Sequence, residues 1–170
     1  MSDASTPIGE VDNEFVMEPI GHVRGGRMAA IDDDWGGERA VIELDGARFD
    51  PDATLGLDEF SHVEVVFVFH LVDPQIVETG SRHPRGRQDW PRVGIFAQRA
   101  RNRRNRLGLS RCRLLAVDGL RLTVEGLDAI NGTPVLDVKP YMSEFAPRGE
   151  IRQPPWSHEL MARYWNLGDA

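Results

Sequence analysis

The sequence predicts a mainly β protein: a single antiparallel β-barrel with short peripheral helices and a C-terminal helix. Short runs of β-branched and aromatic residues recur along the 170 residues, and turn residues separate them. No helical segment lies between these runs, which argues against a doubly wound parallel sheet. No strand–GxGxxG–helix unit and no P-loop occurs, so a Rossmann-type or P-loop nucleotide site is not expected.

The first half of the chain is expected to supply three strands of this barrel. Gly21 marks a bulge in the first strand, and Asp45-Gly46 is a turn that ends the second. The third strand is the strongest of the chain because it is rich in β-branched and aromatic residues and has polar residues at both ends. In chain order we expect a strand at 18–23, a loop at 24–37 containing three consecutive aspartates, a strand at 40–44, one helical turn at 55–60 and a strand at 62–70.

The second half is expected to complete the barrel and to end in a helix. Asp118-Gly119 is a two-residue turn that closes a hairpin. Trp156, Leu160 and Tyr164 recur at helical spacing, and Ser157 is a candidate cap for that helix. The expected elements are a long polar loop at 72–90, a strand at 93–97, a hairpin of 114–117 and 120–124, a short strand at 135–138 and a helix at 156–165.

Length and composition favour one soluble domain. We expect a disordered tail at 1–14 without the features of a secretion signal, a barrel domain at 15–150 and a C-terminal helical extension at 151–170. No apolar run approaches the ~20 residues that cross a bilayer, so no membrane association is expected. The only cysteine, Cys112, excludes an intramolecular disulfide and indicates a cytoplasmic protein; a packed strand thiol is favoured over a nucleophile.

Residues 82–113 carry eleven arginines and one acid, Asp89, in a chain of net charge −7. The window is therefore strongly basic and the rest of the chain strongly acidic. Like charge concentrated on a compact domain indicates a surface that meets a polyanion or an anionic cofactor. Solvated strand edges and loops are the alternative explanation for the same arginines.

Other patterns constrain the chemistry without naming a catalytic residue. The five histidines show no HExxH spacing, and no cysteine pair accompanies them, so no metal site is expected. His70, at the end of its strand, either contacts a ligand at the barrel mouth or is a hydrogen-bonded strand-end histidine. No Ser/His/Asp arrangement is evident, and the paired carboxylates Glu125 and Asp128 carry no assigned role, so the general base stays unknown.

The segment from Asn131 to Pro134 is the more specific element. Glycine at 132 lets the backbone approach a ligand closely because it has no side chain. Thr133 adds a hydroxyl and a backbone amide beside it. Such a loop can hold a polar small molecule by main-chain hydrogen bonds, although composition alone indicates a hairpin turn.

Several segments, in the same order, resemble the TrmO (TsaA/YaeB-like) family, whose members read approximately HPRG, GVFATRSPxRPNPIGLS and LDGTPVLDIKPY. The resemblance extends from about residue 16 to residue 150, and the leading Pro19-Ile20-Gly21 and the strand before His70 also fit. The matching segments here are His83-Pro84-Arg85-Gly86, Gly94 to Arg99, Arg103 to Ser110, and Asp128 to Tyr141.

The resemblance implies a β-barrel methyltransferase that uses S-adenosylmethionine and works as a homodimer. It further implies N6-methylation of threonylcarbamoyladenosine at position 37 of tRNA. The cofactor residues that it implies are His70, Leu71, Arg99, Leu122, Asn131, Gly132, Thr133 and Pro134. By spacing, Asp34 and Trp35 replace a missing cofactor segment, and Asp34 is a hypothetical partner for the methionine amine. The substrate residues that it implies are Arg103, Asn105, Arg106 and Tyr141.

Besides the missing cofactor segment, the sequence departs from the family pattern at three places, one of which is Gln98-Arg99-Ala100 where the family has Thr-Arg-Ser. Both prolines of RPNP are arginines here, Arg104 and Arg106, and Asn131 replaces the acidic residue before Gly-Thr-Pro. Two alternatives therefore accompany the tRNA methyltransferase prediction. One is methyl transfer to a small-molecule substrate, and the other is a non-catalytic barrel that binds S-adenosylmethionine.

Overall fold

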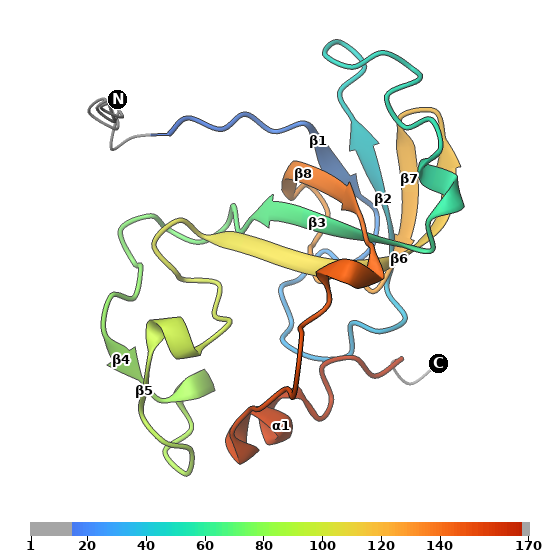
Figure 1. Ribbon diagram of the computed structural model, residues 1–170. Helices are drawn as coiled ribbons and strands as arrows, with labels where there is room; N and C mark the ends of the chain where they lie inside the picture. The colour runs from blue at the N-terminus through green and yellow to red at the C-terminus, as the bar shows by residue number, and fades with distance from the viewer. Residues whose placement is uncertain (1–14, 168–170) are drawn as a thin grey trace, which may run out of the picture.

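The computed structural model describes residues 15–167, and its centre is a closed barrel of six antiparallel strands in the order β1-β2-β7-β6-β3-β8 (Figure 1). This confirms the predicted fold class. The tail expected at 1–14 lies outside the described residues. The strands are β1 (Gly21–Arg24), β2 (Arg39–Leu44), β3 (His62–Val68), β6 (Leu107–Asp118), β7 (Arg121–Glu125) and β8 (Pro134–Pro140).

The smaller elements lie outside the barrel. The chain between β3 and β6 extends to the lower left in Figure 1, and the helix labelled α1 lies below the barrel. These elements are the two-stranded sheet of β4 (Ser81–Arg82) and β5 (Val93–Gly94), the 3-10 helices η1 (Leu57–Glu59), η2 (Pro84–Gly86), η3 (Ile95–Ala97) and η4 (Ser143–Phe145), and α1 (Pro155–Met161). Among residues 15–167, no helix combines the length and the hydropathy needed to span a membrane.

Alternating side chains fill the barrel. In β3, Val63, Val65 and Phe67 point inward and are almost completely buried, whereas the residues between them are partly exposed. This is the period of two that a strand with one buried face requires. Phe67 also explains why residue 108 is glycine, since a Cβ there would lie 2.3 Å from the Phe67 ring.

β6 is the longest strand and pairs with two neighbours. Its first part, residues 107–113, pairs with β3, and its last part, residues 113–118, pairs with β7. The predicted hairpin begins at residue 114, so residues 107–113 of β6 were not predicted as strand. The inward residues there are Gly108, Ser110 and Cys112, which are too small or too polar to show a hydrophobic alternation.

The hairpin turn differs by one residue from its prediction. Asp118 pairs with Arg121, so the two turn residues are Gly119 and Leu120 rather than Asp118 and Gly119. Gly119 has φ 54°, as expected of glycine at the first central position of a primed turn.

Three other local predictions are wrong. The bulge expected at Gly21 is absent from the β1–β2 register; glycine is needed there because a Cβ would lie 2.3 Å from the Glu43 carbonyl oxygen. The strand expected at 93–97 ends at Gly94 and continues as η3. The helix expected at 156–165 ends at Met161, and Ser157 does not cap it, since its hydroxyl donates to the Pro154 carbonyl at 2.6 Å.

The C-terminal segment, defined as residues 155–167, returns to the loop before β2. The amides of Asp34, Trp35 and Gly36 donate to carbonyls of residues 163, 164 and 166 at 2.7–3.0 Å. Glycine at 36 permits this approach, because a Cβ would lie 2.0 Å from the carbonyl oxygen of Trp165. A second anchor joins Trp90 Nε1 to the carboxylate of Glu159 at 2.8 Å.

Candidate cofactor and acceptor cleft

A cleft of about 1500 Å³ lies where the barrel, the arginine-rich chain between β3 and β6, and the C-terminal segment meet. The barrel contributes the end of β3 and the first residues of β6. The opposite walls come from the loop before β2, from η3 and the chain after it, and from the C-terminal segment. Representative lining residues are Trp35, Phe69, Phe96, Leu109, Ile130 and Tyr164.

Six of the eleven arginines of residues 82–113 line this cleft: Arg82, Arg85, Arg99, Arg101, Arg103 and Arg111. Two of them are held by main-chain oxygens. Arg99 donates to the Leu109 carbonyl at 2.8 Å, and Arg103 donates to the carbonyls of Ile95 and Gln98 at 2.9 and 2.8 Å. A carbonyl fixes a guanidinium without cancelling its charge, so both remain available to an anion.

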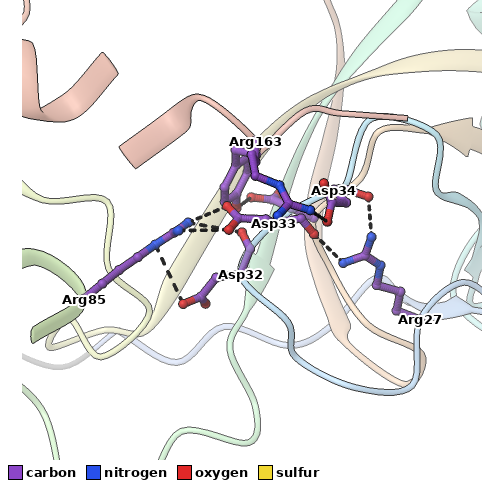
Figure 2. Close-up of polar contacts among 8 residues, drawn as sticks. Arg27, Asp32, Asp33, Asp34, Arg85 and Arg163 are labelled. Carbon is purple, nitrogen blue, oxygen red and sulfur yellow. Dashed lines mark hydrogen bonds and ion pairs between the residues drawn. The ribbon is translucent and has the colours of Figure 1, made fainter. Parts of the chain in front are cut away.

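Arg85 is instead paired with the aspartate run of the loop before β2. Its guanidinium lies 2.8 Å from the carboxylate of Asp33 and 3.8 Å from that of Asp32 (Figure 2). The hydrogen bonds that Arg85 donates to the Asp33 carboxylate raise the pKa of Arg85. Arg85 has the left-handed φ of 50°, an unfavourable conformation for a residue with a Cβ. The aspartate run is therefore a set of specific contacts rather than a freely solvated loop.

Asp34 joins the same loop to the C-terminal segment. Figure 2 shows Arg163 reaching the Asp34 carboxylate, at 3.2 Å, and Arg27 pointing at the main chain of the aspartate run. Arg27 donates to the Asp33 carbonyl at 2.6 Å and to the Asp34 carbonyl, and it also pairs with Glu38. The Asp34 carboxylate is thus engaged by Arg163 and is not among the residues that line the cleft.

A hydrogen-bonded chain at the cleft wall joins Ser110, Asp128 and Tyr164. The Ser110 hydroxyl donates to one oxygen of the Asp128 carboxylate, and the Tyr164 hydroxyl donates to the other at 2.5 Å. Burial raises the pKa of Asp128, and the Tyr164 hydrogen bond and the charge of Arg99 act in the opposite direction. Burial and the neighbouring carboxylate raise the pKa of Tyr164.

The sequence predicts no catalytic or binding role for any of these three residues. Ser110 lies 18 residues before Asp128, and Tyr164 lies 36 residues after it. Spacings of this size carry no local signal. Its spacing from Trp156 and Leu160 predicts Tyr164 on the apolar face of a helix, whereas Tyr164 follows the end of α1 at Met161.

Five of the ten predicted cofactor residues line the cleft. They are Trp35, His70, Leu71, Arg99 and Thr133. Leu122 does not, because its side chain is in the barrel core with no exposed area. Asn131 accepts a hydrogen bond from the Gly25 amide at 2.9 Å, and the Gly132 amide donates to the Val23 carbonyl at 2.8 Å. Asp34 and Pro134 are likewise not among the lining residues.

Of the four predicted substrate residues, the cleft includes only Arg103. Arg106 has φ 52° and donates to the Val72 carbonyl at 3.1 Å, so it shapes the chain that leads into β6. Tyr141 lies against the guanidinium of Arg111, 5.1 Å from its ring centroid. Asn105 is not among the residues that line the cleft. Within residues 15–167, no group of three or more His, Cys, Asp or Glu side chains is placed to hold a metal ion.

Comparison with known proteins identifies relatives of this barrel. The family model for the tRNA-methyltransferase O N-terminal domain matches residues 34–146. A probable S-adenosyl-L-methionine-binding protein of Methanothermobacter thermautotrophicus is 34% identical over 140 residues, which cover 81% of this chain and 98% of that protein. The human tRNA (adenine(37)-N6)-methyltransferase is 36% identical over 100 residues, which cover 59% of this chain and 22% of the human protein.

Similarity to a solved structure supports the same family. The crystal structure of TrmO from Pseudomonas aeruginosa superposes with a TM-score of 0.65 at 29% identity, covering 82% of this chain and 61% of that chain. This chain therefore spans less than two thirds of the length of the tRNA methyltransferases that it matches. The family match nevertheless covers more than half of this chain, and the barrel agrees with the solved structure. The chain belongs to the tRNA-methyltransferase O N-terminal domain family.

Proposed function

We propose that this protein transfers a methyl group from S-adenosylmethionine to N6 of an adenosine in tRNA, at position 37 beside the anticodon. The observation that carries this proposal is the cleft in which Trp35, His70, Leu71, Arg99 and Thr133 meet. Relatives named tRNA (adenine(37)-N6)-methyltransferase support the reaction type. Threonylcarbamoyladenosine is the specific acceptor that we propose.

The residues of the cleft suit this cofactor. The volume of the cleft exceeds the roughly 300–1,000 Å³ of a typical ligand site, which leaves room for an acceptor base beside a cofactor. Phe69 offers an apolar face to an adenine ring, and Arg99 offers a cation to a carboxylate. The bound cofactor supplies an activated methyl group on a sulfonium. The protein then has to align the acceptor nitrogen with that methyl group and keep water out.

The arginines also suit an RNA acceptor. A base in the anticodon loop is single-stranded, which lowers the free energy needed to move it into a cleft. Arg101 and Arg103 at the cleft wall would contact phosphates near that base. Binding of tRNA is then expected to weaken steeply as the salt concentration rises.

We further propose a homodimer in the cytoplasm. Four large apolar side chains at the cleft are largely exposed: Ile31, Leu71, Ile76 and Phe96, the last with 89% of its area accessible. Burying them against a second copy would remove apolar surface from water beside the cleft. Light scattering after size exclusion tests this, and Phe96→Glu should give a monomer if these side chains form the interface.

A second candidate is a barrel that binds S-adenosylmethionine without transferring its methyl group. It is favoured by the name of the Methanothermobacter relative, which describes binding only. Methyl transfer to a small-molecule acceptor is a third. Incubation with methyl-labelled cofactor and total tRNA separates them. Label in RNA supports the first proposal, bound cofactor with unlabelled RNA favours the other two, and no binding at millimolar cofactor refutes all three.

The Arg99→Ala variant tests the cofactor site by calorimetric titration. We expect it to abolish binding of S-adenosylmethionine, since it removes the only contact that we assign to the carboxylate. Arg121→Ala is the matched control, because Arg121 lies outside the cleft and pairs with Glu43 on the barrel surface. Full affinity in Arg99→Ala would refute the proposed site.

A further inference from the structure

The Ser110–Asp128–Tyr164 chain places a carboxylate at the cleft wall with an unusual set of partners. Both oxygens of Asp128 accept from hydroxyl groups, and all three residues line the cleft. Among the ion pairs of residues 15–167, none involves Asp128. A carboxylate fixed by hydroxyls keeps its charge and retains lone pairs that can accept a further N–H.

Attachment of the C-terminal segment does not account for the hydrogen bonds among Ser110, Asp128 and Tyr164. The segment is already held by three main-chain hydrogen bonds to residues 34–36, by the Trp90–Glu159 bond and by the Arg163–Asp34 pair. A partly buried carboxylate is a poor choice for attachment alone, because desolvating it costs free energy that an apolar contact would not.

We propose that Asp128 accepts the proton of the nitrogen that is methylated, and that Tyr164 and Ser110 are positioning residues which aim its carboxylate into the cleft. This inference rests on the proposed methyltransferase function. It also makes the C-terminal segment part of the site, since that segment supplies Tyr164 although it lies outside the matched range 34–146.

The step balances with the groups already named. The acceptor nitrogen forms a bond to the methyl carbon while the carbon–sulfur bond breaks, and that electron pair stays on sulfur. The nitrogen then carries one proton too many, which passes to the Asp128 carboxylate and later to solvent. Burial that raises the pKa of Asp128 makes it a better proton acceptor than an exposed aspartate.

The test compares Asp128→Asn with wild type in single-turnover methyl transfer to tRNA and in calorimetric binding of S-adenosylmethionine. We expect transfer to fall by about 100-fold or more, the usual contribution of a general base, with cofactor affinity unchanged. Asp118→Asn is the matched control, since Asp118 is an exposed aspartate at the hairpin and lies outside the cleft. Urea unfolding at pH 7 checks that Asp128→Asn is folded, because its amide oxygen can accept from only one of the two hydroxyls.

Tyr164→Phe separates positioning from simple attachment. The Tyr164 hydrogen bond lowers the pKa of Asp128, so its loss should shift the acidic limb of the rate–pH profile to higher pH. An unshifted limb would overturn the positioning role. Asp128→Asn activity within threefold of wild type, or an equal loss of cofactor affinity, would overturn the role of Asp128. Inactive wild type would instead refute the methyltransferase proposal, and this inference with it.

Discussion

The Gly36→Ala substitution is the most direct test of how the C-terminal segment is held. The Ala Cβ would lie 2.0 Å from the carbonyl oxygen of Trp165 and 2.8 Å from its carbonyl carbon. Neither atom is the end of a flexible side chain, so the main chain itself must move. Ordinary contact begins near 3.4 Å, so the segment must retreat by more than an ångström.

This movement breaks the hydrogen bonds beside it. The amides of Asp34, Trp35 and Gly36 donate to carbonyls of residues 163, 164 and 166 at 3.0, 2.7 and 3.0 Å, and a shift of that size takes them beyond hydrogen-bonding distance. Each such bond contributes about 1 kcal/mol net, so we expect the attached state to lose about 3 kcal/mol. The equilibrium between attached and detached segment then shifts by about 100-fold.

Amide hydrogen exchange measures this shift directly. In Gly36→Ala, the three amides should lose about two orders of magnitude of protection, while amides of β3 and β6 keep theirs. Gly46→Ala is the matched control, because a Cβ at Gly46 meets only the Leu120 side chain, at 3.6 Å. Unchanged protection at residues 34–36 in Gly36→Ala would refute the close approach on which the reasoning depends.

Three further perturbations test the core and the charges. Phe67→Ala removes the largest buried ring of the barrel and should lower the free energy of unfolding by about 3–5 kcal/mol; a loss below 1 kcal/mol in urea titration would contradict that packing. Burial raises the pKa of Cys112 from 9.0 to about 12, so the folded state favours the protonated thiol. Stability should therefore be unaffected by this group below pH 9 and should fall as the pH rises toward 12, and Cys112→Ala should remove that decline. Arg85→Ala should lower the unfolding temperature at low salt and by less at about 1 M salt, where the Debye length is about 3 Å; an equal loss at both would show that Arg85 contributes packing rather than charge.

Much of the barrel was predictable because its strands show the expected pattern. The alternation of β3 and the paired apolar runs of the β6–β7 hairpin identify half-buried strands. The first part of β6 escaped prediction because its inward side chains are small. Phe67 of β3 fills the space that a larger residue at 108 would need, so the large hydrophobic side chain of this pair belongs to β3 and not to β6.

The site was predictable in its charge and not in its catalytic groups. The arginine window indicated an anion-binding surface, and six of its members do line one cleft. Asp128 and Tyr164 have no local pattern, because their proximity depends on the path of the C-terminal segment past residues 34–37. That path depends on the space left by two glycines, Gly36 and Gly37, which appear in the sequence as an ordinary loop.

β6 shows how this barrel can diversify. Its inward positions are constrained by the packed interior, whereas Leu107, Leu109 and Arg111 project outward and border the cleft. Mutations at the outward positions leave the interior intact, so selection can alter what the protein accepts without destabilising it. A library randomised at those three codons should keep most variants folded while their substrate preference diverges.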